Sequence, residues 1–150
     1  MNHYPRHFAA VVASAQVTSG TATCAIDGLN DRHYYSVWQT TAPLPQSITI
    51  DLGREYGDVS ILGYVPKYQP YINPLTEGSI KKYTVSISTD NRNFTEVASG
   101  EWNGDINLKV VTFPPAKARY IRLEAITAVD DFAAATEIAI GRGKNPSIIK

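Results

Sequence analysis

Alternation of apolar and polar residues with a period of two is the feature that most limits the folds open to this chain. The segments 47–52 and 83–88 both place an apolar side chain at every second position. Such alternation gives a β-strand one dry face and one solvated face. No segment keeps an apolar period of 3.6 residues over three turns, so we expect little helix. The pattern therefore predicts an all-β chain.

Further strand-like segments follow the same logic. Their apolar and β-branched composition predicts strands at 59–65, 94–99, 107–113, 119–125 and 136–140. Turn-forming sequences are found at 51–53, 73–74, 77–78, 90–91, 103–104 and 114–115. Short strands separated in this way are typical of an antiparallel β-sandwich or jelly roll.

Length and composition predict one domain. A chain of 150 residues that is 43% hydrophobic can bury a single core. We expect this domain to span residues 1–141, because Gly141, Gly143 and Pro146 are typical of a tail or linker at 142–150. The run 8–14 is too short for a membrane span and lacks the flanks of a signal peptide.

Charge and motifs exclude several classes of function. Lys plus Arg and Asp plus Glu both number 14, so no net field attracts nucleic acid or an anionic membrane. The single cysteine, Cys24, excludes an internal disulfide. The sequence has no glycine-rich phosphate loop, no two-histidine zinc pattern and no nucleophile elbow. A carboxylate pair for glycoside hydrolysis stays open, because its members need only meet in space.

Short motifs along the chain occur in the order of a known family. They lie at 25–28, 38–40, 45–53, 63–67, 77–83, 86–90, 100–102, 118–123 and 134–138. Together they resemble the discoidin, or coagulation factor V/VIII type C, superfamily, and within it the family 32 carbohydrate-binding modules. The resemblance implies a galactose-binding-domain-like jelly-roll β-sandwich without catalytic activity. It also implies a structural calcium ion, a sugar site in loops at one end, and a place in a secreted or cell-surface glycoside hydrolase.

The resemblance also implies the calcium ligands. They are the side chains of Asp27 and Glu137, the carbonyls of Cys24, Leu29 and Thr136, and Ser36 through its carbonyl and hydroxyl. Oxygen ligands of this kind suit Ca²⁺. Ser36 stands where the family usually has threonine, and the loop is longer than usual, so Asn30 or Asp31 could replace Leu29. The alternative is that Asp27 caps a turn and Glu137 lies on a solvated strand face.

For the sugar, the resemblance implies three polar positions and one aromatic position. They are Gln39, Lys67, Glu77 and Phe132, and the first three differ from the histidine, arginine and asparagine of the family. Tyr68 and Asn73 lie in the neighbouring loop. Sugars present hydroxyl groups and apolar C–H faces, which converging polar groups and a ring can contact. Lys67 and Glu77 are alternatively a pair that jointly contacts vicinal hydroxyls, and an aromatic residue in a turn is often a packing plug.

These features predict a module that binds the terminal, galactose-like sugar of a glycan and targets an attached glycoside hydrolase. The alternative is a discoidin-type adhesion module that binds a protein or membrane surface. Its apolar loop tips would be Tyr68, Tyr71, Ile72 and Leu75. The neutral charge balance argues against anionic lipid as the partner.

Overall fold

The computed structural model describes residues 10–14, 25, 38–40, 43–67, 76–143 and 147–148. Its elements, in chain order, are β1 (Ala10–Ala13), β2 (Trp38–Gln39), β3 (Gln46–Val65), β4 (Lys82–Ser88), β5 (Thr95–Glu101), β6 (Lys109–Ala125), the 3₁₀ turn η3 (Val129–Asp131), β7 (Ala134–Ala135), β8 (Glu137–Arg142) and β9 (Ser147–Ile148). Within these residues, no helix has the length and apolar character needed to span a bilayer.

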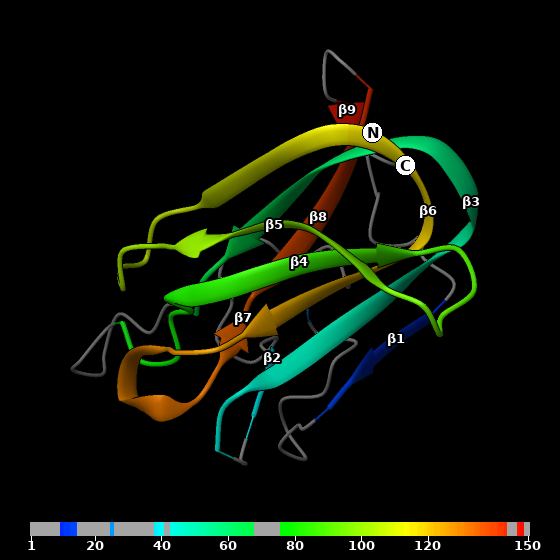
Figure 1. Ribbon diagram of the computed structural model, residues 1–150. Coiled ribbons are helices and arrows are strands. Elements are labelled where there is room, and N and C mark those ends of the chain that lie inside the picture. Colours follow the sequence, from blue (N-terminus) through cyan, green and yellow to red (C-terminus); the bar gives the residue numbers. More distant parts are fainter. Residues whose placement is uncertain are drawn as a thin grey trace.

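Two long strands, β3 and β6, organise the fold. They pair antiparallel along most of their length and bend together, so that one continuous sheet folds back on itself (Figure 1). The strand order of this sheet is β5-β4-β6-β3-β8-β9, and β1 pairs with the first half of β3. β2 and β7 form a separate two-stranded sheet. The result is a two-layer antiparallel sandwich, which confirms the predicted all-β fold.

Two of the expected turns are wrong, because they lie where the long strands bend. The segments 51–53 and 114–115 lie inside β3 and β6, and the pairing register shifts between Asp51 and Ile61. Gly53 has a φ of 89°, a conformation that suits glycine, and its amide donates to the Asp51 carboxylate at 2.9 Å. Prolines lack the amide hydrogen that a regular ladder needs, so they are tolerated at such irregular positions. These residues therefore curve the strands instead of ending them.

The core lies between the two layers. Every second residue of the predicted alternation is buried, as with Ile48, Ile50 and Leu52 of β3. They belong to one hydrophobic cluster with Ile121, Leu123, Ile138, Ile140 and Trp38, which is 0% exposed. Full burial stabilises each large aliphatic side chain by roughly 1.5 to 3 kcal/mol. Trp102 stacks on Tyr83, with ring centroids 3.8 Å apart, and packs against the same cluster.

The C-terminal segment contains a strand. Ser147 and Ile148 of β9 pair with Arg142 and Gly141 of β8. The amide of Gly143 donates to the Asp58 carbonyl at 2.8 Å. The domain boundary at residue 141 stays a prediction, and part of the expected tail is hydrogen-bonded to the sheet.

Candidate functional site

Backbone pairing brings four distant segments to one end of the sandwich. Gln39 of β2 pairs with Ala134 of β7. The Ala134 amide donates to the Gly78 carbonyl at 2.9 Å, and the Thr136 amide donates to the Val65 carbonyl at 2.8 Å. The segments around residues 39, 66, 78 and 134 are therefore held in a single frame.

Lys67 is the centre of the polar groups at this end. Its ammonium nitrogen Nζ donates to Gln39 Oε1 at 2.9 Å and lies 3.6 Å from Glu77 Oε2. The Lys67 side chain is only 8% exposed, whereas that of Glu77 is 23% exposed. Nζ also lies 5.7 Å from the centroid of the Phe132 ring. The structure therefore brings Gln39, Lys67, Glu77 and Phe132 together, and it contains the Lys67–Glu77 pair considered above.

A strained turn places the Phe132 ring. Asp130 and Asp131, at the end of η3, have φ values of 64° and 61°, in the left-handed region. The chain then extends, and the amide after Phe132, that of Ala133, donates to the Thr40 hydroxyl at 3.0 Å. Phe132 itself is half-buried. The turn and this bond fix the ring at the mouth of the candidate site.

Gly78 leaves the space that this ring occupies. Its φ is +80°, and a Cβ atom built there would lie 2.8 Å from Ala134 Cβ and 2.9 Å from Phe132 Cε2. Real Cβ atoms do not approach other atoms so closely, so only glycine fits here without displacing its neighbours. The sequence marks Gly78 as a turn residue but does not show its contact with the ring.

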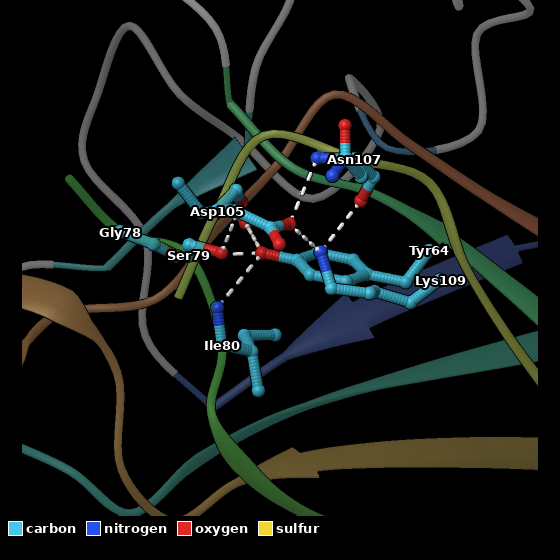
Figure 2. A network of polar contacts seen from close by, with 8 residues as sticks. Tyr64, Gly78, Ser79, Ile80, Asp105, Asn107 and Lys109 are labelled. Carbon is cyan, nitrogen blue, oxygen red and sulfur yellow. Dashed lines mark hydrogen bonds and ion pairs between the residues drawn. The ribbon is translucent and has the colours of Figure 1, made fainter. Parts of the chain in front are cut away.

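Tyr64 places its hydroxyl against the backbone of residues 78–80 (Figure 2). Its hydroxyl donates to the Ala134 carbonyl at 2.5 Å and accepts from the Ile80 amide at 3.1 Å. Complete burial raises the pKa of Tyr64, so the phenol stays protonated and can donate. Sequence reasoning missed this role, because Tyr64 fits the apolar alternation of a strand.

A second group of hydrogen bonds holds residues 79–80 through Ser79. Lys109 Nζ donates to the carboxylate of Asp105 and to the Asn107 carbonyl, and the Asp105 carbonyl accepts from the Ser79 hydroxyl at 2.7 Å (Figure 2). The hydrogen bond from Lys109 lowers the pKa of the Asp105 carboxyl. These contacts hold the residues that follow Gly78.

The predicted calcium residues are described in part. Cys24, Asp27, Leu29 and Ser36 lie outside the described residues, as do Tyr68 and Asn73 of the sugar set. Thr136 is 0% exposed and Glu137 is 1% exposed, so the alternative that Glu137 lies on a solvated face is wrong. Thr136 Oγ1 donates to the Pro66 carbonyl at 3.1 Å, beside Lys67. Among the residues described, no three His, Cys, Asp or Glu side chains cluster as metal ligands.

The arrangement suits recognition of a polyhydroxylated ligand. Glu77 offers acceptors, the Gln39 amide offers a donor and an acceptor, and Lys67 offers ammonium donors. The Phe132 ring lies beside them and can contact a C–H face. Glu77 is the single carboxylate among these four residues, so the cluster does not contain the carboxylate pair that glycoside hydrolysis uses.

Sequence comparisons agree with the motifs. A family model described as the F5/8 type C domain matches residues 10–138. A galactose oxidase of Gibberella zeae is 31% identical over 121 residues, which are 79% of this chain and 17% of the oxidase. An A type blood N-acetyl-α-D-galactosamine deacetylase of Flavonifractor plautii is 31% identical over 128 residues, 82% of this chain and 15% of the deacetylase. The chain thus spans less than a fifth of these curated relatives.

Solved structures with the same fold include sugar complexes. A family 32 carbohydrate-binding module of Clostridium perfringens, in complex with GalNAc-β-1,3-galactose, is similar with a TM-score of 0.81 and 29% identity, over 91% of this chain and 96% of that one. The family 32 module of C. perfringens NanJ, in complex with galactose, is similar with a TM-score of 0.79 and 28% identity, over 91% of this chain and 95% of that one.

Proposed function

The chain belongs to the F5/8 type C domain family, and from this membership we propose that it binds the terminal, galactose-like sugar of a glycan. Its structural neighbours are carbohydrate-binding modules, and the domain is not itself catalytic. Two of these neighbours are complexes with galactose or with a GalNAc-galactose disaccharide.

One observation carries the proposal: Lys67 joins Gln39, Glu77 and Phe132 at the loop end of the sandwich. The pairing with Glu77 offsets the Lys67 charge, which favours a neutral ligand over a charged one. The ring supplies the apolar contact that a sugar C–H face needs. A monosaccharide on so few groups has few atoms to contribute, so we expect a Kd of about 0.1 to 1 mM.

Replacement of the ring tests this site. Phe132→Ala should abolish galactose binding in titration calorimetry while leaving the melting temperature nearly unchanged, because the ring is half-buried at the surface. Phe94→Ala is the matched control, since Phe94 is also half-buried but packs on Arg122 on another face. Galactose binding that survives Phe132→Ala would contradict the proposal. Sedimentation with anionic liposomes, without a response to any sugar, would favour the adhesion module instead.

We also propose a structural Ca²⁺ ion near Glu137. Glu137 and Thr136 are both buried next to the segment of Lys67, and carboxylate, carbonyl and hydroxyl oxygens are the ligands that Ca²⁺ prefers. Glu137 and Thr136 would bind it together with Cys24, Asp27, Leu29 and Ser36. The ion would link the loop before β2 to β8, next to the Lys67 segment.

Chelation tests the ion through stability and not through sugar binding. EDTA should lower the melting temperature by several degrees, because ligand binding to the folded state stabilises it by mass action. Added Ca²⁺ should restore the melting temperature. In Glu137→Gln the response to EDTA should be lost. If neither EDTA nor Ca²⁺ changes the melting temperature of the wild type, the proposed Ca²⁺ site is wrong.

In a longer secreted or cell-surface protein, the domain would hold an attached glycoside hydrolase near its substrate by raising the local concentration. In that full-length protein, Phe132→Ala should slow hydrolysis of an insoluble polysaccharide. Hydrolysis of a small soluble substrate should not change, because no tethering is needed. Equal losses on both substrates would contradict the targeting role.

A further inference from the structure

A groove on the outer face of the sandwich lies apart from the loop end. It has a volume of about 310 Å³ and is lined by Val11, Val12, Thr49, Asp51, Asn91, Tyr120 and Arg122. Volumes of small-molecule sites begin at roughly 300 Å³. The groove is therefore large enough for a small ligand.

Strand register explains why these residues meet. Val12 of β1 pairs with Thr49 of β3, and Thr49 pairs with Arg122 of β6. In the next row Asp51 pairs with Tyr120. Their neighbours Ile50 and Ile121 point into the core, so these side chains face outward. Asn91 comes from the connection between β4 and β5, at the end of the sheet away from the Phe132 loop (Figure 1).

Arg122 is held in a fixed position at the groove. Its Nε donates to Thr49 Oγ1 at 2.8 Å, and its guanidinium carbon lies 3.9 Å from the centroid of the Phe94 ring. Within the part of the chain that the structure describes, its two terminal amino groups make no hydrogen bond or ion pair. The groove thus holds a pre-oriented guanidinium whose charge no described carboxylate neutralises by contact.

The acid in the groove does not cancel this charge. Arg119 donates to both oxygens of the Asp51 carboxylate, at 2.9 and 3.1 Å. This contact lowers the pKa of Asp51 and neutralises its charge locally. The nearest acid on the same face of β6 is Glu124, two residues from Arg122, and it accepts from the Thr84 hydroxyl at 3.2 Å. Arg122 therefore makes the net charge of the groove positive.

We propose that this groove is a second glycan site, and that it binds the carboxylate of a hexuronate residue. A planar guanidinium binds a carboxylate with two parallel hydrogen bonds, so Arg122 would bind the C6 carboxylate. The Tyr120 hydroxyl and the Asn91 amide line the same groove and would contact the ring hydroxyls. The site would bind an acidic sugar, in a module whose loop site favours a neutral one.

Titration of the full chain with sodium glucuronate, followed by amide NMR shifts, tests the site. Glucuronate should shift Thr49, Asn91 and Tyr120 with a Kd of about 1 mM. Glucose and acetate, which supply only the ring or only the carboxylate, should bind at least about tenfold more weakly. The affinity for glucuronate should fall as salt is raised.

Variants separate this site from charge in general and from the loop site. Arg122→Gln should lower the glucuronate affinity at least about tenfold, because it removes a charge-assisted pair. Arg92→Gln is the matched control and should change the affinity little, since Arg92 lies next to Asn91 on the connection between β4 and β5 but does not line the groove. Glu124→Gln should raise the affinity about twofold, by removing a repelling charge.

Phe132→Ala should leave glucuronate binding intact, so failure of the loop site and failure of the groove are distinguishable. Three results would overturn the proposal. They are shifts that fall at Lys67 and Glu77 instead of the groove, acetate binding as tight as glucuronate binding, and unchanged affinity in Arg122→Gln.

Discussion

The loop site and the outer-face groove each hold a cation beside an aromatic ring. Lys67 Nζ lies 5.7 Å from the centroid of Phe132, and the Arg122 guanidinium lies 3.9 Å from that of Phe94. The two cations differ in their polar partners. Lys67 faces the Glu77 carboxylate, whereas Arg122 donates to the neutral hydroxyl of Thr49. We therefore infer that charge compensation, more than the ring, separates the neutral ligand proposed for the loop site from the anion proposed for the groove.

The first way to test this difference is to loosen the support beneath one site. Tyr64→Phe removes a hydroxyl that joins Ile80 to Ala134, and leaves buried backbone groups unsatisfied. We expect a loss of about 2 to 3 kcal/mol of unfolding free energy in urea. Tyr120→Phe, in the groove, is the matched control and should cost little, because that hydroxyl has no hydrogen bond within the described residues. Equal losses would show that the loop end is no better braced than the groove.

A second test displaces the ring of one site alone. Gly78→Ala places a Cβ against Phe132 and Ala134 and forces a φ that alanine disfavours by about 1 to 2 kcal/mol. Galactose affinity should fall about tenfold in calorimetry, while glucuronate affinity stays the same. Gly57→Ala is the control, since nothing lies within 4 Å of its Cβ position. Unchanged galactose affinity in Gly78→Ala would mean that the ring position does not matter.

The third test converts one site towards the other. Glu77→Gln removes the carboxylate that lies 3.6 Å from Lys67, so the loop site should begin to accept an acidic sugar. In an Arg122→Gln background, the ratio of galacturonate to galactose affinity should rise about fivefold, the value of a modest ion pair. NMR titration measures both affinities. An unchanged ratio would contradict the role assigned to charge compensation.

The smallest effect concerns the acid in the groove. The folded-state pKa of Asp51 is lowered, so its pairing stabilises the protein above the unfolded pKa of about 3.9 and this contribution is lost as the pH falls through the folded value. Between pH 7 and pH 2 the melting temperature should fall less in Asp51→Asn than in the wild type. Equal falls would indicate that Arg119 does not hold the Asp51 charge.

The fold class and the meeting of the loop residues could be predicted from the sequence. Alternation sets which face of each strand is buried, and the resemblance to the family 32 modules implies that Gln39, Lys67, Glu77 and Phe132 share one end. The bend of β3 and β6 could not be predicted, because Gly53 and the paired prolines signal a turn as readily as a curved strand.

The groove and the hydrogen bonds of the Tyr64 hydroxyl could not be predicted either. Thr49 and Arg122 are 73 positions apart, and only the pairing register of β3 with β6 brings them together. Tyr64 has the same periodicity as any buried strand residue, so nothing local shows that its hydroxyl bridges two segments. Long-range register, not composition, determines both features.

A crystal structure of the chain soaked in galactose tests the central claim most directly. We predict a sugar ring stacked on Phe132, with hydroxyl groups within hydrogen-bond distance of Lys67 and Glu77. Galactose bound on another face, or a Phe132 ring covered by solvent alone at a saturating concentration of the sugar, would contradict it.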